Sequence, residues 1–374
     1  MEEPIPVSRP FLWGNELENI SAALDSGWIS SHGPMVEAFE HEFGRYVGKG
    51  HAVAVCNGTA AVHLALAALG IGPGDEVIVP DFCMIAPVFA VIYCGAVPVS
   101  VDIDETWNLD PKAVTAAITP RTRAILVVHN YGHPAEMHTI AEIADQHGIP
   151  LIEDAAEALG ASVSGRPAGS FGKVACYSFY ANKLITTGEG GMLVCDDAEL
   201  AKRARWKRSM CFGADNESRF VHSEIGFNYR LTSLQAAVGL AQIEHIEEAL
   251  RRKIEIASHY HARLAGTPGL RLPSTAPWAT HAYWVYGVLV ESAFGPSRRE
   301  LQCRLAEKGI ETRRFFSPVH KQPIFGRKGT SQDFPRSHAI SETGLYLPSF
   351  VGMTEFEIDR VADTIKMIQT SVRH

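Results

Sequence analysis

The chain has 374 residues, of which 46% are hydrophobic and 20% charged, and its formal net charge is −8. This composition is that of a globular protein and excludes a disordered or collagen-like chain, and the length favours two domains. The negative charge argues against a nucleic-acid partner. Because no stretch approaches about 18 uninterrupted apolar residues, we do not expect a membrane partner either.

The seven cysteines are scattered, odd in number and never spaced as Cys-x-x-Cys. This pattern argues against a disulfide framework and against a zinc ribbon. The first residues include Glu2 and Glu3, where a signal peptide would have a basic start. We therefore expect a cytoplasmic protein without a metal site.

Between residues 50 and 200, short apolar runs rich in β-branched residues alternate with longer helical patterns. This alternation predicts an α/β domain in which helices surround a parallel sheet. The predicted strands are 52–56, 76–79, 97–101, 124–128, 150–153 and 174–179, and the predicted helices are 59–69, 84–94, 111–118 and 137–147.

The first predicted strand is followed by Asn-Gly-Thr-Ala at 57–60 and then by a helical pattern. A helix N-terminus offers free N–H groups and the positive end of the helix dipole, so it can hold a phosphate, and Thr59 adds a hydroxyl. Asn57 could equally be a simple N-cap. The motif alone leaves both interpretations open.

Asp154 ends the apolar segment 151–154, at the carboxyl end of a predicted strand. Open parallel sheets bind their ligands at this end. The carboxylate could cap the next helix. Alternatively, it could form a salt bridge with a protonated pyridine nitrogen, which makes the ring an electron sink.

Lys183 follows a β-rich run and precedes a glycine-rich turn, with Phe179, Tyr180, Leu184 and Ile185 as apolar or aromatic neighbours. An amine in such surroundings loses its proton more readily, as Schiff-base chemistry requires. The basic run at 202–208 is typical of a solvated helix face, with contact to a substrate diphosphate as the alternative.

After about residue 245 the pattern changes. We predict one long amphipathic helix over 236–264, followed by a proline-rich connection at 268–277 and shorter mixed elements. The sequence therefore predicts a large cofactor-binding domain over 1–245 and a smaller C-terminal α/β domain over 246–374.

Three segments carry a family resemblance. They are Glu-Asp-Ala-Ala-Glu-Ala at 153–158, Ser-Phe-Tyr-Ala-Asn-Lys-Leu-Ile-Thr-Thr-Gly-Glu-Gly-Gly at 178–191 and Gly-Phe-Asn-Tyr-Arg-Leu-Thr at 226–232. The chain resembles the sugar aminotransferases of the DegT/DnrJ group. Within this group it is most similar to the GDP-perosamine synthases, through Trp-Ile-Ser-Ser at 28–31, the segment 70–80, Ile-Gly-Phe-Asn-Tyr-Arg at 225–230 and Pro-Val-His at 318–320.

The resemblance implies a pyridoxal-phosphate-dependent transferase of fold type I, with a mainly parallel seven-stranded sheet, that forms a homodimer with shared active sites. It implies that Lys183 carries the cofactor as a Schiff base, that Asp154 pairs with the pyridine nitrogen and that Glu157 faces the phenolic oxygen. The implied phosphate and cofactor contacts are Gly58, Thr59, Ala60, Ser178 and, from the neighbouring subunit, Asn228. The implied substrate contacts are His320, Arg230, Trp28 and Ser30.

The chain departs from the group at the position that stacks on the cofactor. Relatives usually place an aromatic ring there, in a segment of the form Pro-x-x-Thr-aromatic. This chain has Pro-Asp-Phe-Cys-Met at 80–84, so Met84 takes that place. A thioether can contact a ring face, but the change puts cofactor affinity in question.

The resemblance implies that an amino acid, by family analogy glutamate, donates an amino group to a keto-sugar nucleotide. The best match is the conversion of GDP-4-keto-6-deoxymannose to GDP-perosamine. A 3-keto sugar nucleotide and a keto-cyclitol remain alternatives, as does a non-catalytic regulatory relative. A sugar dehydratase is disfavoured, because such relatives replace the lysine with histidine.

Overall fold

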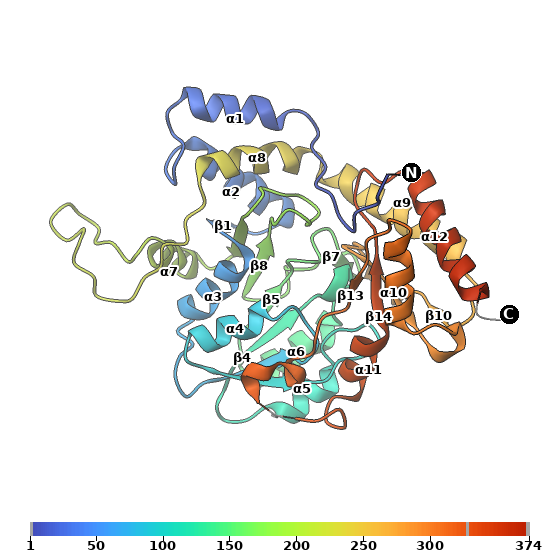
Figure 1. Cartoon of the computed structure of the whole chain (residues 1–374). Helices are drawn as coiled ribbons and strands as arrows, with labels where there is room; N and C mark the ends of the chain where they lie inside the picture. The colour runs from blue at the N-terminus through green and yellow to red at the C-terminus, as the bar shows by residue number, and fades with distance from the viewer. Residues whose placement is uncertain (1–2, 327–328, 372–374) are drawn as a thin grey trace.

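The computed structural model describes residues 3–326 and 329–371 (Figure 1). Its centre is a seven-stranded sheet with the strand order β1-β9-β8-β5-β4-β2-β3. The five strands from β8 to β3 run parallel, whereas β9 is antiparallel to both of its neighbours. The predicted α/β fold with a mainly parallel sheet is confirmed. The strands are β1 (His51–Val55), β2 (Glu76–Pro80), β3 (Val97–Val101), β4 (Thr122–Val128), β5 (Leu151–Asp154), β8 (Val174–Ser178) and β9 (Gly191–Cys195).

Helices cover both faces of this sheet. One face carries α3 (Gly58–Ala68), α4 (Ala86–Tyr93) and α7 (Ala198–Arg208). The other face carries α2 (Pro34–Val47), α5 (Pro111–Ala117), α6 (Met137–His147) and α8 (Ser233–Glu244). Helix α1 (Glu16–Asp25) lies on the outer side of α8 (Figure 1).

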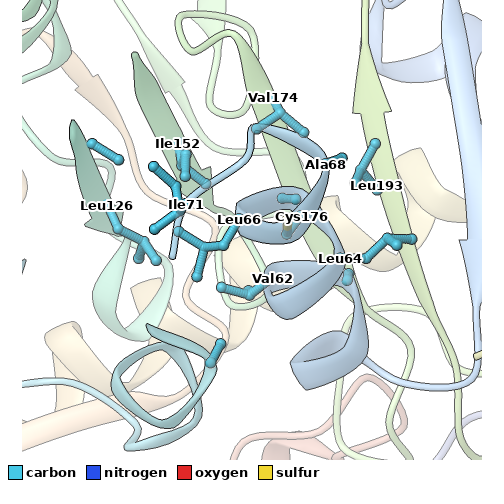
Figure 2. Close-up of a cluster of buried hydrophobic side chains, with 14 of the residues drawn as sticks. Val62, Leu64, Leu66, Ala68, Ile71, Leu126, Ile152, Val174, Cys176 and Leu193 are labelled. Atoms are coloured by element: carbon cyan, nitrogen blue, oxygen red, sulfur yellow. The ribbon is translucent and has the colours of Figure 1, made fainter. Parts of the chain in front are cut away.

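Helix α3 lies in the middle of one hydrophobic core (Figure 2). It is apolar on nearly all sides because the sheet lies on one side and α4 and α7 lie on the others. Its Leu66 belongs to the same cluster as Ile152 and Val174, which come from the centre of the sheet. A helix that is hydrophobic all round belongs in a core, so the position of its N-terminus is firmly fixed.

The C-terminal part of the chain builds a second core around a four-stranded antiparallel sheet, in the order β10-β12-β14-β13. These strands are β10 (Leu270–Arg271), β12 (Tyr286–Val290), β13 (Arg313–Arg314) and β14 (Gly344–Leu347). Helices α9 (Ile246–Leu264), α10 (Arg298–Glu307) and α12 (Glu355–Thr370) pack on it. The remaining elements are β6 (Ser162–Val163), β7 (Arg166–Pro167), β11 (Ala279–Thr280), α11 (Pro335–Thr343) and the short 3₁₀ turns Asn130–Gly132, Ser292–Phe294, Val319–Lys321 and Pro323–Phe325.

The prediction of one helix over 236–264 is wrong. The chain forms α8 and α9, which are separated at His245, where φ is −111° and ψ is 11°. The His245 ring stacks on Trp13 from the N-terminal segment, with ring centroids 4.7 Å apart. This long-range contact accompanies the break, and the local hydrophobic pattern does not reveal it.

The predicted division of the chain into 1–245 and 246–374 stays a prediction. The break at His245 coincides with it, but Ile5 packs in the second core and pairs with Ile310. None of the helices within the described ranges has the length and apolar character needed to cross a membrane.

Candidate active site

A cavity of about 450 Å³ lies at the carboxyl end of the central strands. Val128, Asp154 and Ser178 line it, and they end the adjacent strands β4, β5 and β8. Open parallel sheets bind ligands at this end. The other lining residues come from the start of α3, from loops of the sheet and from the C-terminal part: Asn57, Gly58, Thr59, Val62, Met84, Ala86, Pro87, Ala156, Glu157, Tyr180, Asn182, Lys183, Glu189, Trp284, Arg313, Phe316 and Tyr346.

The start of α3 forms one end of the cavity. Asn57 is the N-cap, and its side chain accepts a hydrogen bond of 2.8 Å from the backbone N–H of Ala60. A Cβ atom on Gly58 would lie 2.8 Å from the Ser178 Cβ atom, so the absence of a side chain lets the helix approach the end of β8. Ala60 itself does not line the cavity. The N-cap interpretation of the motif is therefore confirmed. Gly58 and Thr59 face the cavity, and their contact with a phosphate stays a prediction.

Asp154 supplies a buried carboxylate to the same cavity. Its Oδ1 atom accepts a hydrogen bond of 3.0 Å from the backbone N–H of Ala156. Burial raises the pKa of this carboxyl group, and the Ala156 hydrogen bond and the nearby Lys183 amine oppose the shift. Such a carboxylate favours a cationic ligand group beside it.

Lys183 lies against an acid and an aromatic ring. Its Nζ atom is 3.9 Å from Glu157 Oε1 and 3.8 Å from the centre of the Trp284 ring. Burial lowers the pKa of the Lys183 amine, and burial raises the pKa of Glu157 to about 7. Both shifts favour the neutral forms of the two groups.

Two backbone features hold this pair in place. The N–H of Tyr131 donates a hydrogen bond of 2.9 Å to Glu157 Oε2, and Tyr131 has a left-handed φ of 56°. A non-glycine residue in that region is uncommon and is often found at functional sites. A Cβ on the next residue, Gly132, would lie 2.6 Å from the backbone nitrogen of Trp284, so only glycine lets the backbone at Trp284 approach this closely.

Met84 lines the cavity and is 45% exposed, and its place beside the cofactor stays a prediction. The aromatic neighbour Phe82 is fully buried and packs against Tyr131 and Phe315. Met84, and not Phe82, is therefore the large side chain that the 80–84 segment presents to the cavity.

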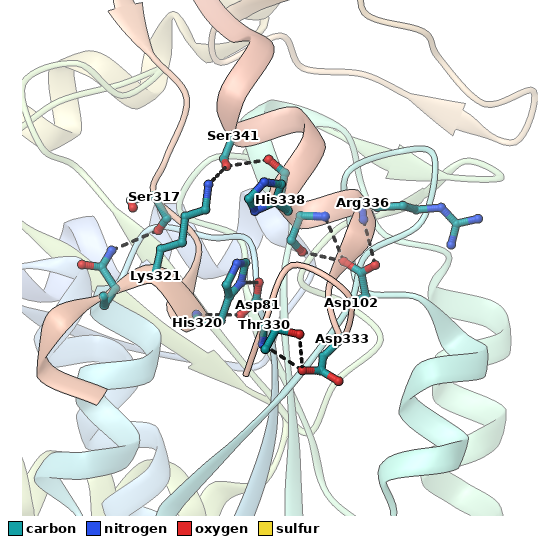
Figure 3. Close-up of polar contacts among 12 residues, drawn as sticks. Asp81, Asp102, Ser317, His320, Lys321, Thr330, Asp333, Arg336, His338 and Ser341 are labelled. Atoms are coloured by element: carbon teal, nitrogen blue, oxygen red, sulfur yellow. Dashed lines mark hydrogen bonds and ion pairs between the residues drawn. The ribbon is translucent and has the colours of Figure 1, made fainter. Parts of the chain in front are cut away.

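His320 is buried and does not line the cavity. It lies against Asp81 (Figure 3). Its Nδ1 atom lies 2.6 Å from Asp81 Oδ2, and its backbone N–H donates to Asp81 Oδ1. Asp81 directly follows β2 and begins the segment that carries Met84. His320 thus ties the C-terminal part of the chain to that segment.

Four other predicted residues lie away from this cavity. Asn228 is exposed, and its Oδ1 atom accepts hydrogen bonds from the Arg230 guanidinium. Trp28 is 54% exposed, and Ser30 lies beside it at the surface. Within one chain, none of the four contributes to the cavity.

The basic run on α7 is largely engaged in ion pairs. Arg205 and Arg208 pair with Glu40 at 3.4 and 2.7 Å. Arg203 and Lys207 pair with Glu224 at 3.3 and 2.7 Å. These contacts favour a structural role for the run. Among the residues described, no group of three or more histidine, cysteine, aspartate or glutamate side chains is placed to hold a metal ion.

Sequence reasoning missed the contribution of the C-terminal part to the cavity. Trp284, Arg313, Phe316 and Tyr346 come from three separate segments after residue 280. No local motif marks them. The only sequence signal nearby is the Pro-Val-His segment at 318–320, two residues after Phe316.

A model of the DegT/DnrJ/EryC1/StrS aminotransferase family matches residues 12–366. GDP-perosamine synthase of Caulobacter vibrioides is 43% identical, over 97% of this chain and 98% of that protein. The structure of DesV of S. venezuelae in complex with a ketimine intermediate has a TM-score of 0.91 at 38% identity, covering 98% of this chain and 99% of that chain. The PLP-form of the putative sugar aminotransferase Spr1654 of Streptococcus pneumoniae has a TM-score of 0.92 at 26% identity, with 99% of each chain covered. These matches confirm the predicted aminotransferase activity and pyridoxal phosphate as its cofactor, and they show that the chain belongs to the DegT/DnrJ/EryC1/StrS aminotransferase family.

Proposed function

We propose that this enzyme transfers an amino group from L-glutamate to GDP-4-keto-6-deoxymannose and so forms GDP-perosamine. The observation that carries the proposal is the convergence of Lys183, Asp154 and the α3 N-terminus on one cavity. The choice of acceptor rests on the 43% identity to a GDP-perosamine synthase over 97% of the chain.

The cavity suits the three polar parts of pyridoxal phosphate. The phosphate fits the α3 N-terminus, where Gly58 leaves room beside Ser178 and where backbone N–H groups and the helix dipole favour an anion. The buried Asp154 carboxylate suits a protonated ring nitrogen, and the Lys183 amine suits the aldehyde. When bound, the cofactor supplies an electron sink for the carbon that loses or gains the amino group.

We assign the proton transfers to Lys183. Its neutral amine removes the proton from the α-carbon of the donor, and the same Nζ atom delivers a proton to the carbon that receives the amino group in the acceptor. Burial supports this role because it lowers the pKa of the amine. Glu157 lies 3.9 Å from the amine, and Asp154 would keep a proton on the ring nitrogen of a bound cofactor.

We propose further that two chains form a homodimer in which each completes the other's site. The segment between α7 and α8, residues 209–232, forms a long loop whose outer part extends away from the body of the molecule, whereas its last residues return to pack beside β1 (Figure 1). It exposes Phe220, Val221 and Ile225 at 75, 68 and 82%. Such apolar exposure on an extended arm supports contact with a second copy, which would bring Asn228 and Arg230 to the partner's cavity.

The unpaired state of all seven cysteines supports our assignment to the cytosol.

The acceptor can be tested on the two half-reactions. The purified holoenzyme is first converted to its amine form with L-glutamate, and the excess is removed. GDP-4-keto-6-deoxymannose, a 3-keto nucleotide sugar and a keto-cyclitol are then added separately, and the return of the aldehyde-form absorbance is followed. We expect a fast return with the GDP sugar only. If one of the other two compounds restored the aldehyde-form absorbance, that compound would replace GDP-4-keto-6-deoxymannose as the acceptor. If glutamate did not convert the holoenzyme to its amine form, the proposed donor would be refuted.

A further inference from the structure

The amino-acid donor needs a binding site for its α-carboxylate. This carboxylate is one bond away from the carbon that carries the amine, and that carbon must meet the Lys183 amine. The group that binds the carboxylate must therefore line the same cavity as Lys183. The inference rests on the proposed function and concerns the residue that recognises the donor.

The charges around the cavity leave one candidate in this chain. Asp154, Glu157 and Glu189 are acidic, and Lys183 and Arg313 are the basic side chains among the described lining residues. Lys183 already lies beside Glu157 and performs the proton transfers. Arg313 is thus the guanidinium that the chain carrying Lys183 itself presents to the cavity, and guanidinium groups bind carboxylates through two parallel hydrogen bonds.

Arg313 is placed to take a small anion. It lies on the short strand β13, where the antiparallel register puts it opposite Tyr346 of β14, and Tyr346 also lines the cavity. The Arg313 side chain is 56% exposed, and its Nη2 atom is 3.3 Å from the half-exposed Glu311 carboxylate. The guanidinium also makes a hydrogen bond with the Tyr346 hydroxyl. The exposed ion pair with Glu311 is weak, so a carboxylate in the cavity can replace Glu311 as the partner of the guanidinium.

We propose that Arg313 binds the α-carboxylate of the amino-acid donor, with the Tyr346 hydroxyl beside it as a second hydrogen-bond donor. The same guanidinium releases the carboxylate of the keto-acid product. The diphosphate of a sugar nucleotide is separated from the keto carbon by the sugar ring, so its binding group lies farther from Lys183. Arg313 therefore acts in the donor half of the reaction.

The test compares Arg313→Gln with Arg314→Gln. Arg314 is the next residue on β13, is exposed and does not line the cavity, so it controls for the loss of one positive charge on the same strand. For each holoenzyme, stopped-flow absorbance gives the second-order rate constant for its reaction with L-glutamate. A separate experiment gives the second-order rate constant for the reaction of the amine form with the keto-sugar nucleotide. Calorimetry with maleate, an unreactive dicarboxylate, measures binding without turnover.

We expect Arg313→Gln to lower the donor rate constant by about tenfold to a hundredfold, as loss of a charged hydrogen-bonded contact predicts. Arg313→Gln should weaken the binding of maleate by a similar factor and change the rate constant of the sugar half-reaction by less than about threefold. Arg313→Lys should restore part of the lost donor rate constant. Arg314→Gln should match the parent. An equal loss in both half-reactions, or a loss confined to the sugar half-reaction, would overturn the assignment. Failure of the parent itself to react with glutamate would instead refute the proposed function.

Discussion

Acidification should destabilise the fold through His133, which is 3% exposed and satisfied only as a neutral ring. Its Nδ1 atom donates to the carbonyl of Pro134 at 2.7 Å, and its Nε2 atom accepts from the N–H of Ala276 at 3.1 Å. A second ring proton, on Nε2, would place this N–H group against the Ala276 N–H, so that two hydrogen-bond donors would face each other. Burial accordingly lowers the pKa of His133 from 6.5 to about 4.

The size of the effect follows from this difference in pKa. Above pH 6.5 the ring is neutral in both states, and stability does not change on this account. As pH falls from 6.5 to 4, His133 takes up a proton in the unfolded chain but stays neutral in the folded chain, so the folded state loses stability. At about 1.36 kcal/mol per pH unit, the loss reaches about 3 kcal/mol, a large share of the roughly 5–15 kcal/mol that stabilises a typical domain.

Urea unfolding between pH 7.5 and 4.5 would measure it, with the free energy of unfolding of the parent compared with that of His133→Gln at each pH. We expect the difference between parent and variant to shrink by about 1.4 kcal/mol per pH unit below pH 6. Replacement of the exposed His147, on α6, provides the control and should leave the slope of the parent unchanged. Parallel curves for the parent and His133→Gln would refute the reasoning.

Three further predictions concern the site. Gly58→Ala should weaken the cofactor at least about tenfold in a titration of the apoenzyme, because the added Cβ would lie 2.8 Å from the Ser178 Cβ atom, and unchanged affinity would mean that the helix start does not hold the phosphate. Lys183→Ala should abolish turnover, and mixing it with an impaired Asn228→Ala chain should restore about one site per dimer; no recovery after subunit exchange would place both residues in one chain's site. Met84→Tyr should change cofactor affinity by no more than about tenfold, since ring and sulfur contacts are each worth up to about 1.5 kcal/mol, and Met84→Ala should weaken it more. Parent-like affinity of Met84→Ala would remove Met84 from the cofactor face.

The central sheet could be predicted because its strands and helices differ in local pattern. The six predicted strands appear within about two residues of their expected bounds. Strand β9 (Gly191–Cys195) was not predicted individually, because it follows the glycine-rich turn and no helical segment separates it from β8. The break between α8 and α9 was not predicted because the local hydrophobic pattern continues through it, and the contact that accompanies it, between His245 and Trp13, joins residues far apart in the sequence.

The candidate site divides in the same way. Asp154, Ser178 and the 57–60 turn stand at ends of predicted strands, where the sheet rule brings them together. Arg313 and Tyr346 are different, because they meet only through the register of two short strands in another sheet. Local periodicity does not indicate which residues of two distant segments pair with each other. The place of these two residues at the cavity is therefore known only from the folded structure.

The hydrogen-bonded pair of Asp81 and His320 limits how this enzyme can be recombined with its relatives. Its two members come from opposite halves of the chain, and together they hold the start of the segment that presents Met84. A chimera that takes its C-terminal third from another protein would keep Asp81 and replace its partner. Unless the incoming segment offers an equivalent imidazole, a carboxylate would remain buried without its partner, which is costly. Exchange of acceptor specificity by segment swapping therefore has to carry both residues, or neither.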